Sequence, residues 1–536
     1  MKLMTSAESR VVGFFASKKG VHMFYSILFP TPEQHGDQRQ SAAPDCFKDL
    51  NLDRIFDAVL GGKKEFELEN FFFTPLRDPE IVLYRQAVMR DLENAELRVL
   101  LTGFSGTVYD IGKYMNTIRA LLTSEDVRHN NYLMRGHMLD YADRYCSAVF
   151  GLMKGLAKLT PRSDGISRFL KYLFSYGESE SFSEFCNRVK RLREGFSGVE
   201  YNMLIKNGTI RVRRYEGQSN HAEQILKSFE KFRQGSVKDY RRKLSDEPYA
   251  VHVEAAVLDM VAGLYKDIFA DLRDFCLQYF YFDDETILRF SREIQFYLSW
   301  LEFIAPLRET GLPFCYPGLC RTAEHIYSFD GFDLLLARMA CEKTVTNDFV
   351  LNAPEHIIVV TGPNQGGKTT FARAFGQIHY LALLGLCVPG SEASVYLFDN
   401  ILTHFGRQED LSMLSGRLRD DLVRLRALFD RATKKSVIIV NEIFSSTTLS
   451  DALTLGRHML DKFAALGAVV VAVTFLDELA TNGPETVSMM STVREDNPLE
   501  RTFKIIRKPP DGLAHAIHIA EKHGLTYKQL CGRLGK

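Results

Sequence analysis

A glycine-rich stretch at residues 361–370 holds the residue types that could bind a phosphate. It reads TGPNQGGKTT, and four of its residues fit the spacing G-x-x-x-x-G-K-[ST]: Gly362, Gly367, Lys368 and Thr369. Glycines let successive backbone N–H groups turn inward around an anion, because no Cβ stands in the way. The pattern therefore predicts a loop that cradles the phosphates of a nucleoside triphosphate.

The polar side chains of this stretch have distinct tasks in such a loop. Lys368 supplies a positive charge that reaches the β- and γ-phosphates, and the Thr369 hydroxyl can coordinate Mg²⁺. We therefore expect ATP and Mg²⁺ as cofactors, with Thr369 as a metal ligand. The expected nucleotide-binding residues are Gly362, Pro363, Asn364, Gly366, Gly367, Lys368, Thr369 and Thr370.

A strand and a helix must position this loop. The run HIIVV at residues 356–360 is short, β-branched and bounded by Pro354 and Gly362, which is typical of a buried strand. Residues 371–384 are helical in pattern, and a helix that starts here points its positive N-terminal end at the same anion.

A second polar site follows another apolar run, residues 437–440, which ends in Asn441 and Glu442. In P-loop ATPases a strand followed by Asp-Glu holds Mg²⁺ through water and positions the attacking water. Here the first position is the neutral Asn441, which can still accept a hydrogen bond from a Mg²⁺-bound water. We expect Glu442 and Asn441 as catalytic residues, and Asn441 in the metal shell. A third strand at 468–473 completes a mostly parallel sheet with the nucleotide at its carboxyl edge.

The composition is that of a globular protein, with 46% hydrophobic and 25% charged residues and no net charge. We find no apolar run of the roughly 20 residues that would cross a bilayer, and no secretory signal in the first 20 residues. The nine cysteines form no CxxC pair, which indicates reduced thiols and no zinc site. We expect a cytoplasmic protein without membrane contact.

The charge is unevenly distributed, because residues 188–243 contain 15 Lys and Arg against 6 Asp and Glu. Within this segment, residues 201–205 and 209–213 flank Asn207-Gly208, which predicts a β-hairpin with a two-residue turn. A basic hairpin between helices is a candidate DNA contact, and a solvated basic face is the alternative. The expected DNA-binding residues are Lys206, Arg211, Arg213 and Arg214.

The glycine-rich stretch resembles the Walker A string of the MutS DNA mismatch-repair ATPases, TGPNxGGK[ST], and Asn364 makes the match more specific than a general P-loop. Residues 401–406 (ILTHFG) are similar to the family's I-F-T-R-I-G segment, and residues 441–451 match its D-E-x-G-R-G-T-S-T stretch in position. Residues 501–534 look like its closing strand and helical tail.

The resemblance implies an α plus α/β fold in four parts. Residues 1–60 are an N-terminal segment of unclear role, and 61–327 form a long helical core and lever with a small β clamp at 188–243. Residues 328–500 form a P-loop, ABC-type ATPase domain with a mostly parallel sheet, and 501–536 form the terminal strand and helical tail. The family also implies a homodimer through the ATPase domains that binds double-stranded DNA. Branched DNA is the other expected ligand, since two basic clamps can enclose a junction.

Several positions depart from the family pattern. Asn441 stands where the family has Asp, and Phe475 stands where it has His. The sequence LSG at residues 414–416 looks like the signature of ABC-type ATPases, so Ser415 is expected to meet the partner's γ-phosphate. The first 60 residues contain no F-x-E motif, so we expect binding that is insensitive to single mismatches.

These observations predict a MutS-type DNA-binding ATPase that is slow because of Asn441, with a role in mismatch repair or recombination. A nucleotide-gated DNA-binding scaffold with little hydrolysis is the first alternative. An SMC-type or ABC-type ATPase of another DNA process is the second, but it requires long heptad runs, which we do not find around the P-loop.

Overall fold

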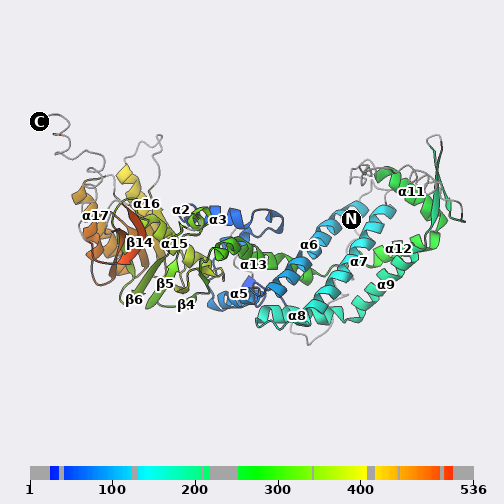
Figure 1. Ribbon diagram of the computed structural model, residues 1–536, viewed down its shortest axis with the longest axis horizontal. Coiled ribbons are helices and arrows are strands. Elements are labelled where there is room, and N and C mark those ends of the chain that lie inside the picture. Colours follow the sequence, from blue (N-terminus) through cyan, green and yellow to red (C-terminus); the bar gives the residue numbers. More distant parts are fainter. Residues whose placement is uncertain are drawn as a thin grey trace, which may run out of the picture. The chain divides into compact units, whose positions relative to one another are not determined.

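The computed structural model describes residues 24–35, 42–123, 131–206, 209–217, 251–340, 343–406, 417–442, 444, 447–494, 500–510 and 531. The chain divides into two compact units (Figure 1). Unit 1 holds Phe24 with the described parts of Glu96–Thr160 and Ser167–Arg292, and unit 2 holds those of Tyr25–Ala95, Pro161–Ile166 and Glu293–Lys536. Among the described residues, no helix has the length and apolarity that crossing a membrane requires.

Unit 1 is built from long helices and one hairpin. Its helices are α6 (Ala95–Thr123), α7 (Asn131–Leu156), α8 (Asp164–Gly177), α9 (Glu180–Ser197), α11 (Val251–Leu264), α12 (Lys266–Gln278) and the first part of α13 (Glu285–Glu309). The hairpin pairs β1 (Tyr201–Lys206) with β2 (Thr209–Arg214) in antiparallel register. The predicted helical region and the predicted hairpin are therefore confirmed, while the turn at 207–208 lies outside the described residues.

Helix α9 shows how the sequence fixes this unit locally. Ser179 caps the helix by accepting a hydrogen bond from the backbone N–H of Phe182. Phe182, Phe185, Val189 and Leu192 are buried at the spacing of one helical face. Gly198 follows the last residue of the helix as its C-cap, and β1 begins three residues later, so α9 leads directly into the hairpin.

Unit 2 is organised around a six-stranded sheet of order β10-β11-β12-β7-β13-β14. The strands are β7 (Ile357–Thr361), β10 (Ile401–Phe405), β11 (Val437–Asn441), β12 (Val469–Val473), β13 (Thr486–Val493) and β14 (Arg501–Arg507). The first five strands in this order run parallel, and β14 pairs antiparallel with β13. The predicted mostly parallel sheet is confirmed.

Helices cover both faces of this sheet. The helices α16 (Arg417–Arg431) and α17 (Leu449–Leu466) pack on one face, where Val359, Val440 and Val470 belong to one core cluster. Helix α15 (Lys368–Ala382) packs on the other, because a methyl at Gly376 would meet Ile439 of β11 and Leu50. The sheet is therefore buried on both faces, as parallel sheets are.

Two smaller sheets complete unit 2. One has the order β4-β9-β5-β6, from β4 (Gly318–Cys320), β5 (His325–Gly331), β6 (Asn347–Asn352) and β9 (Glu392–Tyr396), and the other pairs β3 (Phe314–Cys315) with β8 (Val388–Pro389). The remaining helices are α2 (Cys46–Asp49), α3 (Leu52–Val59), α4 (Glu69–Phe73), α5 (Pro79–Asp91) and α14 (Leu334–Ala340), and the 3-10 helices are η1 (Glu33–His35), η2 (Lys64–Phe66) and η4 (Asp477–Thr481).

The units do not follow the boundaries at residues 60 and 327 that the sequence suggested. Residues 25–95 belong to unit 2, and 293–327 do as well. The physical reason is long-range packing, as when the Gln377 side chain of α15 donates to the backbone oxygen of Leu50, and Tyr380 donates to that of Phe72.

Candidate functional site: a phosphate-binding loop and a basic hairpin

The glycine-rich loop connects β7 to α15 at the carboxyl edge of the sheet. In the strand register, Val360 lies opposite Val473, and Val473 lies opposite Asn441. The ends of β7, β11 and β12 therefore meet at one edge, the place where open α/β sheets bind ligands. The predicted strand, loop and helix are confirmed, although the helix begins at Lys368, three residues before the predicted start.

Backbone conformation and packing both require the glycines of this loop. Gly362 and Gly367 have φ angles of 109° and 91°, in the left-handed region that glycine favours. A Cβ on Gly362 would lie 2.9 Å from the backbone oxygen of Ser491 on β13, and one on Gly366 would overlap the Ser491 side chain. Gly367 caps α15 without a side-chain hydrogen bond, which leaves the first-turn N–H groups to an anion.

Lys368 is folded back onto this loop. Its Nζ donates to the backbone oxygens of Gly362 and Pro363 at 2.8 and 2.9 Å, and it lies 4.4 Å from the centre of the Phe475 ring. The residue is only 4% exposed. Burial lowers the pKa of Lys368 to about 8, and the nearby carboxylate of Glu442 opposes that shift. The ammonium group is thus held at the loop in a poorly solvated place.

Thr369 and Asn441 are in direct contact. The Thr369 hydroxyl donates to Oδ1 of Asn441 at 2.9 Å, and Asn441 is buried at the end of β11. The described residues contain no cluster of three or more His, Cys, Asp or Glu side chains that could hold a metal alone. A cation at this place would therefore be held by the hydroxyl, the amide oxygen and oxygens of the bound phosphate.

Glu442 follows directly and is half-buried. Its backbone has a φ of 54°, and its N–H donates to the backbone oxygen of Val473 at 2.9 Å. A glutamate with positive φ is uncommon and indicates a constrained turn. The strand ends thus bring together Lys368, Thr369, Asn441 and Glu442, and this is the arrangement that the sequence predicted.

Three neighbours of the loop were not among the predicted site residues. Ser491 on β13 packs against the glycines, and Arg501 on β14 donates its Nε to the backbone oxygen of Asn364 at 3.2 Å. Phe475, known from the sequence only as a departure, covers the Lys368 ammonium. No motif marks Ser491 or Arg501, which lie far along the chain. Only the pairing of β13 with β7, and of β14 with β13, could have pointed to them.

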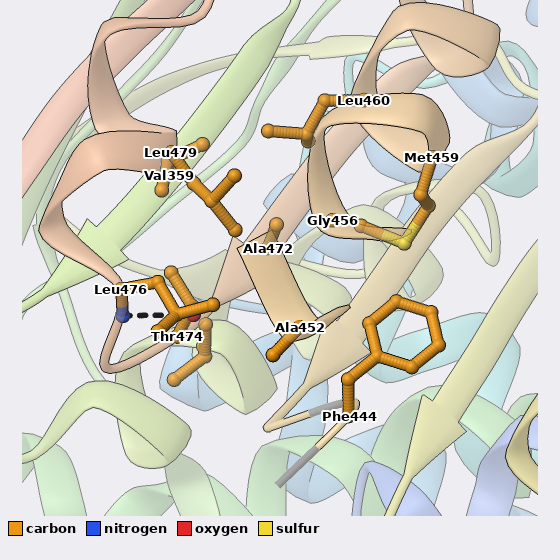
Figure 2. A pocket seen from close by; sticks show the side chains of 11 residues that line it. Val359, Phe444, Ala452, Gly456, Met459, Leu460, Ala472, Thr474, Leu476 and Leu479 are labelled. Atoms are coloured by element: carbon orange, nitrogen blue, oxygen red, sulfur yellow. Dashed lines mark hydrogen bonds between the residues drawn. The ribbon is translucent and has the colours of Figure 1, made fainter. Parts of the chain in front are cut away.

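A small pocket lies near the same strand ends but has a different character (Figure 2). It is about 10 Å³ in volume and lined mainly by apolar side chains, among them Val359, Met459 and Leu479. Figure 2 shows these side chains pointing into it, with the Thr474 hydroxyl turned to the backbone N–H of Leu476. A pocket with room for about one water molecule is a gap in the core, and it cannot hold a nucleotide.

The hairpin presents three of the four predicted cations on one face. Leu204 lies opposite Arg211, Asn202 opposite Arg213 and Lys206 opposite Thr209. Side chains directly opposite each other share a face, and successive residues alternate. Lys206, Arg211 and Arg213 therefore form an exposed basic face, which we call the hairpin face.

Arg214 is on the other face of the hairpin. Its guanidinium donates to the backbone oxygen of Leu264 at the end of α11 and lies 4.8 Å from the ring centre of Tyr265. Val212 on the same face packs against the cluster formed by Val261, Ala262 and Phe269. Arg214 thus anchors the hairpin to the helices.

Some predicted elements lie outside the described residues. These are Ser415 with the rest of the signature at 414–416, the clamp beyond residue 217 and the tail at 511–530.

Comparison with known proteins gives one family match and relatives of part of the chain. The family model of MutS domain V matches residues 358–528. The protein named Endonuclease MutS2 of Levilactobacillus brevis is 29% identical over 198 residues, which are 36% of this chain and 25% of that protein. The DNA mismatch repair protein MutS of Thermotoga neapolitana is 23% identical over 320 residues, which are 58% of this chain and 36% of that protein.

Residues 358–528 thus match the MutS family, and the chain is similar to a MutS and a MutS2 protein. The resemblance that the sequence motifs predicted is therefore confirmed. The chain spans a quarter of the length of the MutS2 relative and about a third of the MutS relative.

The MutS domain V match begins on β7 and includes the phosphate-binding loop together with β11, β12, β13 and β14. The hairpin face lies before the matched residues. The family match thus bears directly on the loop, while the role of the hairpin is inferred from its own charge and geometry.

Proposed function

We propose that this chain binds ATP with Mg²⁺ at the β7–α15 loop, hydrolyses it slowly and couples nucleotide binding to contact with DNA. One observation carries the proposal: a glycine loop in which a Cβ on Gly362 or Gly366 would clash with Ser491, a buried lysine and the Thr369–Asn441 pair meet at one edge of the sheet.

The loop fits the phosphates of ATP. Positive φ angles at Gly362 and Gly367 and the uncapped first turn of α15 direct backbone N–H groups to an anion. Lys368 exchanges its two carbonyl partners for phosphate oxygens, and the negative charge there raises the pKa that burial had lowered. The phosphate thus supplies a negative partner for the Lys368 ammonium group, whose charge burial had made unfavourable.

Thr369 and Asn441 would hold the metal. Bound Mg²⁺ would neutralise charge that develops on the phosphate oxygens. The Thr369 hydroxyl would supply an oxygen ligand, and the amide oxygen of Asn441 would accept a hydrogen bond from a water bound to the cation. Because Asn441 supplies no negative charge, this site would hold the metal more weakly than one with a carboxylate, and turnover would be slow.

Glu442 orients and deprotonates the attacking water. Its position directly after β11 and next to Lys368 places a carboxylate beside the phosphate-binding loop. We also propose a homodimer through the ATPase domains, in which Ser415 of each chain completes the other's site, as the sequence resemblance implied.

The hairpin face supplies the DNA contact. Lys206, Arg211 and Arg213 are exposed on one side of a hairpin that its other side anchors to α11. Phosphate contacts of this kind set affinity without reading sequence. Double-stranded DNA is the proposed partner, and branched DNA is proposed as a better ligand because two hairpins can enclose a junction.

ATP binding to the full chain tests the proposal. Lys368→Ala should weaken Mg-ATP binding by at least roughly tenfold in calorimetry, because a buried charged contact is lost. Lys435→Ala is the matched control, since Lys435 is exposed just before β11, at the opposite edge of the sheet. Equal affinity in wild type and Lys368→Ala would refute the assignment.

A nucleotide-gated scaffold with little hydrolysis remains the second candidate. The neutral Asn441, hydrogen-bonded to Thr369, favours it, because the pair can bind a cation without strongly activating the phosphate.

A further inference from the structure

Two cysteines of unit 1 lie with their sulfur atoms close to bonding distance. Sγ of Cys186 on α9 is 2.8 Å from Sγ of Cys146 on α7, although 40 residues separate them in the chain. Both are free thiols in this structure. A disulfide bond is about 2.05 Å long, so forming one requires the two sulfurs to approach by less than about 1 Å.

Contacts on both sides of the pair keep the two helices in register. Toward the end of α9, Arg193 forms ion pairs with Asp140 and Asp143 of α7 at 2.7 and 3.3 Å. Toward its start, the rings of Phe182 and Phe150 lie 5.5 Å apart. The two sulfurs therefore meet within a continuous helix–helix contact, and closure requires no separation of α7 from α9.

We propose that Cys146 and Cys186 are a reversible disulfide pair that responds to peroxide. The Cys186 thiol gives up its proton, its sulfur attacks one oxygen of hydrogen peroxide, and the O–O bond breaks. The products are a sulfenic acid and hydroxide, which takes up that proton and leaves as water. The Cys146 sulfur then attacks the sulfenic sulfur, and the displaced hydroxyl group takes the proton of the Cys146 thiol and leaves as a second water. Two thiols lose two electrons in total, the peroxide gains them, and a dithiol reductant reverses the reaction.

Exposure gives the two thiols different roles. Cys186 is partly exposed, so peroxide can reach it, while Cys146 is buried at 7% exposure. The hydrogen bond between the two thiols and the burial of Cys146 raise the pKa of the Cys146 thiol above its ordinary value. Cys186 therefore reacts first, and Cys146 resolves the sulfenic acid.

The bond would link α9 to α7 just before the hairpin begins. Since α9 ends at Ser197 and β1 starts at Tyr201, the disulfide stabilises the helix pair that supports the hairpin. This inference goes beyond the proposed ATPase function, and its outcome does not depend on nucleotide or DNA binding.

The test is peroxide treatment of the reduced full chain, followed by thiol alkylation, digestion and mass spectrometry. We expect a peptide that joins Cys146 to Cys186, restored to two alkylated thiols by dithiothreitol. We also expect the oxidised protein to unfold at a temperature at least roughly 5 °C higher, because the bond closes a 40-residue separation.

Variants separate the proposed pair from general oxidation. Cys146→Ser should leave Cys186 as a sulfenic acid that dimedone traps, with no cross-link. The matched control is Cys276→Ser, which changes a buried cysteine of α12 in the same unit and should keep both the cross-link and the temperature shift. Wild-type protein in which both thiols are alkylated after peroxide, or in which Cys186 proceeds to sulfinic acid without a cross-link, would overturn the proposal.

Discussion

Removing two cations from the hairpin face should change the salt dependence of DNA binding by a calculable amount. Each phosphate contact contributes a slope of about −0.9 to the dependence of log K on log salt. The double variant Arg211→Ala/Arg213→Ala removes two of the three exposed cations on this face, so the slope should become shallower by about 1.8 per hairpin. When salt is raised fourfold, from about 50 to about 200 mM, wild-type protein and the double variant should both lose DNA affinity. The factor by which affinity falls should be roughly 12 times smaller in the double variant.

Fluorescence anisotropy with a labelled duplex at several salt concentrations measures this slope directly. Arg214→Ala is the matched control, because Arg214 faces α11 and contacts Leu264 and Tyr265. It should lower the unfolding temperature of the chain and leave the slope nearly unchanged. An unchanged slope in the double variant, or an equal change in Arg214→Ala, would refute the assignment of the hairpin face.

Three further predictions concern the phosphate-binding loop. Burial lowers the pKa of Lys368 to about 8, so above that pH the free protein must take up a proton before Lys368 can pair with phosphate. ATP affinity measured by calorimetry should therefore fall by about tenfold for each pH unit above 8. The Lys368→Ala variant should show no such fall. Asn441→Asp should raise steady-state phosphate release by roughly tenfold, because a carboxylate stabilises the bound metal better than an amide. This factor corresponds to a barrier lower by about 1.4 kcal/mol. An unchanged rate would favour the scaffold with little hydrolysis. Gly366→Ala should weaken ATP binding in calorimetry, since its methyl would overlap the Ser491 side chain; unchanged affinity would show that the loop accommodates a Cβ.

The sequence predicted the parts of the site that depend on short-range patterns. A β-branched run followed by glycines and a helical stretch predicted β7, the loop and α15, and a polar pair after an apolar run located Asn441 and Glu442. The Asn207-Gly208 sequence likewise predicted the hairpin, and the observed pairing of Lys206 with Thr209 has the register expected for two residues between the strands.

Contacts between residues far apart in the sequence could not be predicted from these short-range patterns. Nothing in residues 25–95 indicates that they join unit 2, because the contacts of Leu50 and Phe72 with α15 span more than 300 residues. The contact of Phe475 with Lys368 also depends on tertiary structure. The sequence alone does separate the two faces of the hairpin, since adjacent residues such as Arg213 and Arg214 cannot share a face of a strand.

Phosphate release by wild type and by Glu442→Gln tests the central claim most directly. If the carboxyl edge of the sheet is an ATPase site, wild-type protein should release phosphate slowly, and Glu442→Gln should abolish release while ATP remains bound at wild-type affinity. Wild-type protein that binds ATP but shows no turnover above that of Glu442→Gln would contradict the ATPase assignment.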